Sequence, residues 1–189
     1  MKILVIGGSG FIGSRLANQL SVHGHSVHPV DIAFPPYIDV VDERSITKAV
    51  TDYRPDVIYY TAAIMRSEEC RHNPTRACDV NLQGLSNTLK ACVDANVKRF
   101  IFSSTVHVYA ATDDQDVHED TVLDINKPIH IYPYTKIAGE MLIKSFQYLY
   151  NLPYTILRYG IVYGPGGHDD MVVHSFVKKC MNKEPLMLE

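Results

Sequence analysis

Tyr132 and Lys136 are the pair whose residue types and spacing best fit proton-transfer chemistry. They stand four apart in residues 132–150, where apolar residues recur at helical spacing, so both project from one face of the expected helix. Tyrosine has a pKa of about 10, too high for a base at neutral pH, but a nearby ammonium stabilises the phenolate. With a hydroxyl such as that of Thr105 orienting the substrate, the pair predicts removal of a proton from an alcohol. The alternative is an ordinary surface pair, because this spacing is common on helices.

A glycine motif at residues 7–13 predicts a dinucleotide site near this pair. Gly7, Gly10 and Gly13 follow an apolar run at residues 3–6 and open an amphipathic segment that begins with Phe11 and Ile12. Gly7 permits a tight turn out of the strand, Gly10 lets backbone approach a pyrophosphate, and Gly13 allows close packing of helix on strand. The free N–H groups at the helix start then face the phosphates. A chance match in a loop is the alternative.

Asp31, at the end of an expected strand over residues 26–30, indicates which dinucleotide is bound. A carboxylate here accepts hydrogen bonds from the adenosine ribose hydroxyls and repels a 2′-phosphate. No Arg or Lys follows in residues 32–34. The sequence therefore favours NAD over NADP. The alternative is that Asp31 only starts a turn before Pro35 and Pro36.

These residues need a scaffold, and strands alternate with helices along the chain. We expect strands at residues 3–6, 26–30, 38–41, 56–60, 99–102 and 154–158, and helices from residue 11 and at 43–53, 76–96, 132–150 and 171–182. This rhythm predicts an α/β fold, a doubly wound parallel sheet of the Rossmann type with helices on both faces. Ligands bind beyond the carboxyl ends of such strands, where Thr61, Ala62 and Ala63, and then Ser103 and Thr105, are expected.

Composition excludes several other classes of protein. The chain has 189 residues, enough for one sizeable core, and a net charge of −3, so no basic surface indicates nucleic-acid or membrane binding. Its four cysteines form no C-x-x-C pair, which indicates neither a zinc site nor a disulfide framework and makes a cytoplasmic protein with free thiols the default. The acidic stretch 110–131, which includes Asp113 and Asp114, fits a solvated loop better than a metal site.

Taken together, the motifs resemble those of the extended short-chain dehydrogenase/reductases, within them the NAD-dependent epimerase/dehydratase family. Residues 7–13 resemble the opening of the family, residues 60–63 the segment under the cofactor, and residues 157–159 and 162–165 the exit from the last strand of the nucleotide-binding domain. The resemblance implies that Thr105, Tyr132 and Lys136 are catalytic, that Asp42 lies near adenine, and that Asn81 has a structural and cofactor-positioning role. The implied cofactor-binding residues are Gly7, Gly10, Phe11, Ile12, Gly13, Asp31, Asp42, Thr61, Ala62, Ala63, Asn81, Ser103, Tyr132, Lys136 and Tyr159.

The resemblance further implies an NAD-dependent epimerase that acts on a nucleotide sugar, with a UDP-sugar as first candidate. In that reaction Tyr132 acts as base while a hydride leaves the sugar C4 for bound NAD and later returns. The alternatives are a reductase or dehydrogenase of the same family and a non-catalytic NAD-binding module. Residues 1–160 are expected to form the NAD-binding domain, and residues 161–189 the beginning of a substrate-binding domain that is largely missing. A homodimer through the helices that contain Asn81 and Tyr132 is also implied.

Two departures from the family pattern bear on the reaction. Val106 and His107 stand where sugar 4,6-dehydratases carry acidic residues, which favours an epimerase or reductase over a dehydratase. His107 is either an acid or base in its own right or a partly buried structural histidine. Ile161 replaces a substrate-binding Asn found in many relatives, so the resemblance implies less about the sugar.

Overall fold

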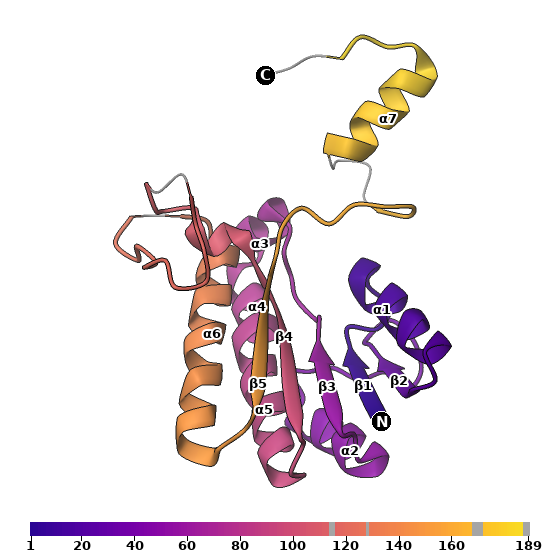
Figure 1. Ribbon diagram of the computed structural model, residues 1–189, viewed down its shortest axis with the longest axis vertical. Coiled ribbons are helices and arrows are strands. Elements are labelled where there is room, and N and C mark those ends of the chain that lie inside the picture. The colour runs from indigo at the N-terminus through magenta and orange to yellow at the C-terminus, as the bar shows by residue number, and fades with distance from the viewer. Residues whose placement is uncertain (114–115, 128, 168–171, 187–189) are drawn as a thin grey trace. The chain divides into compact units, whose positions relative to one another are not determined.

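The computed structural model describes residues 1–113, 116–127, 129–167 and 172–186, and the chain divides into two compact units, Met1–Tyr159 and Gly160–Glu189. The first unit is a parallel five-stranded sheet in the order β2-β1-β3-β4-β5 (Figure 1). Its strands are β1 (Lys2–Ile6), β2 (Ser26–Val30), β3 (Val57–Tyr60), β4 (Arg99–Thr105) and β5 (Tyr154–Tyr159). The expected doubly wound α/β fold is confirmed.

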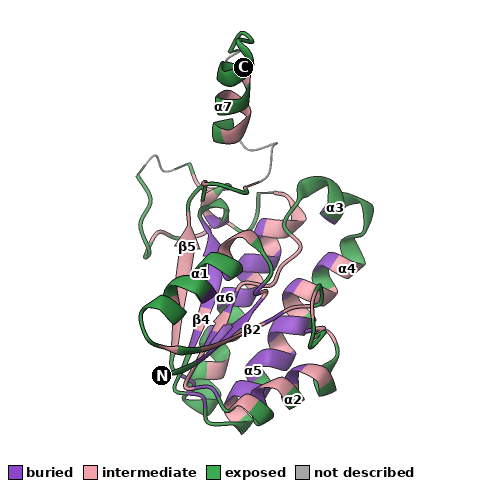
Figure 2. Ribbon diagram, turned by 90° about the vertical axis from the view of Figure 1, so that its right-hand side faces the viewer, coloured by how far each residue is buried: buried purple, intermediate pink, exposed green. Residues whose placement is uncertain are grey.

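Helices cover both faces of this sheet. The segment α1 (Phe11–Val22) packs on the face that carries Ile3 and Val5. The opposite face carries Leu4 and Ile6 and is covered by α2 (Glu43–Tyr53), α5 (Gly84–Asp94) and α6 (Ile131–Tyr150). Alternate residues of each strand therefore point into separate apolar layers, as the pleat of a strand requires. Figure 2 shows that the buried positions concentrate on the strands and on the inner sides of α5 and α6.

The expected strand at residues 38–41 is wrong. This segment has no partner strand, and side chains satisfy its backbone instead: the Asp39 carboxylate accepts a hydrogen bond from the Val41 N–H at 3.0 Å, and the Asn87 amide donates to the Val40 and Val41 carbonyls at 3.0 Å each. Short polar side chains that bond nearby backbone compete with sheet ladders in this way. β4 is longer than expected, because Ser103, Ser104 and Thr105 pair with Leu157, Arg158 and Tyr159.

The helix expected at residues 76–96 runs through residues 74–94 in three parts: α4 (Pro74–Cys78), a π-helical turn η1 (Asp79–Gln83) and α5. Asn73 caps it, accepting from the Arg76 N–H, and Pro74 occupies the first turn, where a missing N–H does no harm. A short helix that the sequence did not predict, α3 (Ser67–His72), precedes it. Cys70 is the buried residue of α3, so the segment offered no apolar periodicity.

The second unit, Gly160–Glu189, contains α7 (Val172–Asn182), which confirms the helix expected there, although its expected first residue, Met171, lies outside the described residues. Within this unit the His174 Nε2–H donates to the Gly164 carbonyl oxygen, 2.7 Å away. Gly167 leaves room for that imidazole, since a Cβ on it would approach the ring within 2.4 Å.

The turn from β1 to α1 depends on two glycines. Gly7 has a φ of +84°, and a Cβ there would lie 2.5 Å from the Ala62 nitrogen at the end of β3. A Cβ on Gly13 would lie 2.1 Å from the Gly7 carbonyl oxygen. Neither position accepts a side chain, so α1 begins in direct backbone contact with the turn that follows β1.

Gly13→Ala is therefore expected to lower the free energy of unfolding by about 3 kcal/mol, because backbone must move to admit the methyl group. Gly160→Ala is the control, since a Cβ there meets no atom within 4 Å. Urea unfolding measures both. Equal unfolding midpoints for the two variants would contradict the packing described for Gly13.

Candidate active site

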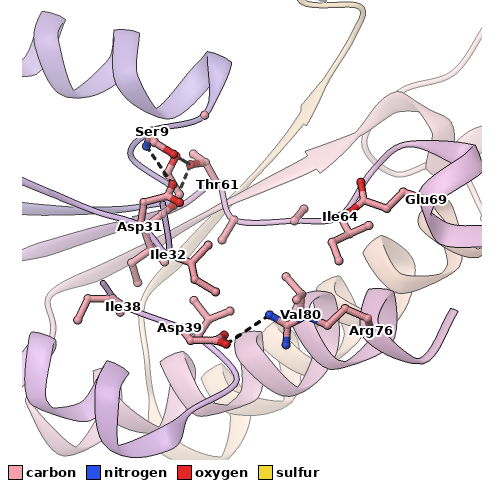
Figure 3. Close-up of a pocket in the computed structure, with 16 residues that line it drawn as sticks. Ser9, Asp31, Ile32, Ile38, Asp39, Thr61, Ile64, Glu69, Arg76 and Val80 are labelled. Atoms are coloured by element: carbon pink, nitrogen blue, oxygen red, sulfur yellow. Dashed lines mark hydrogen bonds and ion pairs between the residues drawn. The ribbon is translucent and has the colours of Figure 1, made fainter. Parts of the chain in front are cut away.

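A pocket of about 440 Å³ lies at the carboxyl ends of β1, β2 and β3 (Figure 3). It brings together the glycine turn, the residue after β2 and the segment after β3, as the motif argument predicted. The lining residues are Ile6, Gly7, Ser9, Gly10, Asp31, Ile32, Ile38, Asp39, Val40, Thr61, Ala62, Ala63, Ile64, Glu69, Arg76 and Val80.

Asp31 is held in this pocket by backbone donors. Its Oδ2 accepts from the Ser9 N–H at 3.0 Å, and its Oδ1 accepts from the Ala33 N–H at 3.1 Å. The carboxylate therefore has a fixed position between the glycine turn and the loop after β2. It does form a local turn, as the alternative interpretation held, yet it also faces the pocket.

Asp42 does not line the pocket. Its carboxylate caps α2 by accepting from the Arg44 N–H at 3.0 Å. Asp39 lines the pocket instead, and its Oδ2 accepts from the Arg76 Nη2–H at 3.3 Å. The sequence contained a signal for this role of Asp42: an Asp immediately before an amphipathic segment is typical of an N-cap.

Phe11, Ile12 and Gly13 lie in the first turn of α1 and are not part of the pocket lining. Phe11 contacts its own helix, with the Arg15 guanidinium 4.5 Å from its ring centroid. Of these three residues, Gly13 has a structural reason to be glycine, which is its close contact with the Gly7 carbonyl oxygen.

Lys136 is a buried cation beside the end of β4. It is 3% exposed, its Nζ donates to the Ser103 carbonyl oxygen at 2.8 Å, and it lies over the Phe102 ring at 4.6 Å and the Tyr132 ring at 5.7 Å. Burial lowers the pKa of Lys136 to about 7, and the negative charge of Glu140 opposes this. In this state the ammonium is easily deprotonated.

Tyr132 lies beside this lysine, Thr105 forms a hydrogen bond with Tyr132, and Tyr159 forms one with Ser103, the residue that binds the lysine. Burial raises the pKa of Tyr132, and a smaller, opposite effect comes from its hydrogen bond with Thr105. Burial likewise raises the pKa of Tyr159, opposed by a hydrogen bond with Ser103. The structure thus brings the expected catalytic residues into one cluster on the start of α6 and the ends of β4 and β5. The phenol of Tyr132 is protonated here, so its use as a base needs a further positive charge nearby.

Asn81, inside the π-helical turn, links the two sides of the site. Its Oδ1 accepts from the Ile64 N–H and its Nδ2 donates to the Ile64 carbonyl, both at 2.8 Å. The same Nδ2 donates to the Thr135 hydroxyl on α6 at 3.0 Å. The widened turn aims this buried amide inward, and it fixes the segment after β3 against α6.

His107 is exposed, which is not what the structural interpretation expected. It belongs to η2 (Val106–Tyr109), and its backbone N–H donates to the Thr105 hydroxyl at 3.2 Å. In the acidic stretch, Lys127 pairs with Asp113 at 2.6 Å, while Asp114 lies outside the described residues. Among the described residues, no three His, Cys, Asp or Glu side chains gather as metal ligands. None of the described helices is long and apolar enough to span a bilayer.

Comparison with known proteins then decides the family. The sequence profile of the NAD dependent epimerase/dehydratase family matches residues 3–188. The chain belongs to this family. Its expected resemblance is confirmed over nearly the whole length.

Other members of the family are similar throughout the chain. Protein CapI of Staphylococcus aureus is 31% identical and aligns with 98% of this chain and 61% of its own. The UDP-glucose 4-epimerase of Thermotoga maritima, solved with UDP-glucose, has a TM-score of 0.85 at 29% identity over 98% of this chain and 65% of its own. The UDP-glucuronic acid 4-epimerase of Bacillus cereus, solved with UDP-glucuronic acid and NAD, has a TM-score of 0.83 at 28% identity, with the same two coverages. The chain thus spans less than two thirds of the length of these relatives.

The buried lysine predicts a stability that depends on pH. The unfolded chain keeps the Lys136 ammonium up to its ordinary pKa of 10.5, whereas the folded chain releases the proton near pH 7. Between these values the unfolded state binds more protons, so this group makes stability rise with pH. The expected gain from pH 7 to pH 9 is about 2 kcal/mol.

Lys136→Met removes that contribution, so the parent should gain about 2 kcal/mol relative to the variant over this range in urea unfolding. Lys144→Met, on the exposed side of the same helix, is the control and should keep the slope of the parent. A constant difference between parent and Lys136→Met from pH 7 to 9 would rule out the depressed pKa.

Proposed function

We propose that this chain carries the cofactor and proton-transfer site of an NAD-dependent nucleotide-sugar epimerase. The observation that supports this most directly is the cluster of Thr105, Tyr132 and the buried Lys136 beside the pocket of Gly7, Gly10 and Asp31. Relatives that align with 87% to 98% of the chain are named UDP-glucose 4-epimerase and UDP-glucuronate 4-epimerase. We assign residues 1–160 to NAD binding and residues 161–189 to the beginning of a substrate-binding domain.

The pocket suits NAD. A Cβ on Gly10 would meet no atom but the Gly7 carbonyl oxygen, at 3.3 Å, so the loop leaves open space where a pyrophosphate would lie against backbone N–H groups. Asp31 would accept from the adenosine ribose hydroxyls, and its charge disfavours a 2′-phosphate. We expect Asp39, rather than Asp42, to face the adenine, while Thr61, Ala62 and Ala63 line the opposite wall.

NAD supplies the hydride acceptor and donor when it is bound. The chain supplies the proton transfer: Thr105 orients the C4 hydroxyl of the sugar, and Tyr132 removes its proton. The Lys136 ammonium stabilises the resulting phenolate, and the positive charge of an oxidised nicotinamide beside Tyr132 would lower its pKa in the same sense. After the oxidised sugar has rotated in the site, Tyr132 returns the proton to the C4 oxygen.

The four cysteines, all free, support a cytoplasmic location. Exposed thiols such as those of Cys78 and Cys180 persist in a reducing compartment. We infer that the protein acts there.

Tyr132→Phe tests the reaction. Proton NMR follows the chain with NAD and either UDP-galactose or UDP-glucuronate, and the parent should interconvert the C4 epimers. The variant should lose about 10²- to 10⁴-fold of the rate yet bind NAD, because only the proton acceptor is removed. Tyr134→Phe, which removes a hydroxyl bonded to the Lys127 carbonyl, is the matched control.

Undiminished turnover by Tyr132→Phe would overturn the assignment. Accumulation of NADH by the parent, seen as absorbance near 340 nm, would instead indicate a dehydrogenase. NAD binding without conversion of either sugar would favour another sugar or a non-catalytic module.

We also propose a homodimer through α6 and the helix of residues 74–94. The outward side of α6 carries large apolar residues, with Met141 61% exposed, Tyr148 83% and Leu149 62%. Such a stripe is typical of a helix that packs against a partner. α5 lies beside α6 in the same layer, so two copies could meet in a four-helix arrangement.

Met141→Lys should weaken that dimer at least about tenfold, because the ammonium would be buried in an apolar contact. Sedimentation velocity across a concentration series measures the dissociation constant. Met181→Lys, at a residue of α7 that is 81% exposed, is the control and should leave it unchanged. A parent that is monomeric at every concentration would refute the interface.

A further inference from the structure

Glu140 is a buried carboxylate that none of the preceding roles uses. It lies four residues after Lys136 on α6, on the same face, and its side chain is 3% exposed. Its Oε1 accepts from the Ser104 hydroxyl at 2.5 Å and from the Arg158 Nε–H at 3.0 Å, and its Oε2 accepts from the Arg158 Nη2–H at 2.7 Å. Buried charges with this degree of pairing hold a fixed geometry.

Arg158 extends the same network to the loop after β4. Its Nη1–H groups donate to the Tyr109 hydroxyl and, at 3.0 Å, to the Glu119 carbonyl oxygen. The Tyr109 hydroxyl donates in turn to the His118 carbonyl oxygen at 2.8 Å. One guanidinium therefore joins α6, β5 and the polypeptide around residues 118–119.

The network also adjoins the cluster of Thr105, Tyr132 and Lys136 directly. Ser104 and Arg158 are register partners on β4 and β5, and the next pair along the two strands is Thr105, which belongs to that cluster, and Tyr159. On α6, Tyr132, Lys136 and Glu140 follow one another at intervals of one turn. Displacing Glu140 would therefore displace both the helix and the strand ends that hold the cluster.

We propose that Glu140 and Arg158 are positioning residues for the Tyr132–Lys136 pair: their buried ion pair fixes α6 against the ends of β4 and β5 and sets the charge on Lys136. This inference rests on the proposed catalytic roles of Tyr132 and Lys136. Neither Glu140 nor Arg158 lines the pocket.

Glu140 is the negative group that opposes the effect of burial on the Lys136 pKa. Arg158 pairs with Glu140, so its positive charge offsets part of the effect of Glu140 on the lysine. Other titratable groups near this site are Tyr132 in α6, Cys70 in α3, Tyr59 in β3, Tyr109 in η2 and Tyr159 in β5. None of these residues is substituted in the variants that test the proposal.

The test is the pKa of Lys136, measured from its ¹³Cε resonance in the lysine-labelled chain without cofactor or substrate. The resonance is assigned by its loss in Lys136→Met. Glu140→Gln should lower this pKa by about one unit, because a nearby negative charge is lost. Arg158→Met should raise it by about one unit, because Glu140 is then left uncompensated. In the double variant this pKa should lie between the values of the two single variants.

Two exposed charged residues, Asp94 and Arg99, supply matched controls. Asp94→Asn removes a carboxylate from an exposed i, i+4 pair with Lys90, and Arg99→Met removes an exposed cation at the far end of β4. Neither should move the Lys136 resonance. Shifts of one sign in both Glu140→Gln and Arg158→Met, or none in either, would overturn the proposal and indicate a merely structural ion pair.

The design remains decisive if a variant does not fold. Glu140→Gln is isosteric and keeps an oxygen for Ser104 and Arg158, and each single variant predicts a signed shift by itself. Epimerase assays are separate: if the proposed function holds, Glu140→Gln should lower kcat about tenfold with unchanged NAD affinity. A failed assay leaves the NMR result standing.

Discussion

The ammonium of Lys136 is enclosed by protein, with the Ser103 carbonyl oxygen as its hydrogen-bond acceptor and the rings of Phe102 and Tyr132 at 4.6 and 5.7 Å. Removing a charge from water is expensive, so this single group constrains everything near it. The strand end must present a carbonyl, the ring of Phe102 must lie beneath, and a negative charge must lie close enough to keep the proton bound. Ser103, Phe102 and Glu140 meet these conditions from β4 and from the next turn of α6.

A second constraint acts at the other end of the site, where backbone rather than charge sets the limit. Gly7 and Gly13 bring α1 against the turn after β1, and the Thr61 hydroxyl bonds the Ile6 and Gly7 carbonyls at 2.8 and 3.1 Å. That contact leaves the pocket between Asp31 and Ala62 open. Asn81 couples the two regions, because its amide holds the segment after Thr61 and also the Thr135 hydroxyl, one residue from Lys136.

Much of this arrangement follows from sequence alone. Apolar runs bounded by glycines predicted β1, β2 and their alternation with helices. The spacing of Tyr132 and Lys136 predicted that they share one face of a helix. The failures have physical causes. Residues 38–41 alternate like a strand, but Asp39 and Asn87 satisfy the backbone locally, and no periodicity distinguishes that from a ladder. The resemblance placed Asp42 near adenine, whereas in the structure Asp42 caps α2 and Asp39, which the sequence did not single out, lines the pocket. Glu140 was missed although its spacing from Lys136 repeats that of Lys136 from Tyr132.

The residues that sequence reasoning missed share a property that explains why. Glu140 and Arg158 are charged residues in positions where pattern rules expect apolar ones, and each is tolerable only because the other is present. Such pairs are visible in a sequence only once the fold has brought α6 beside β5. Their placement also bears on the balance between stability and chemistry. A neutral residue at position 136 would fold with less electrostatic cost, so stability alone does not account for the buried cation, whereas its proposed action on the phenol of Tyr132 does.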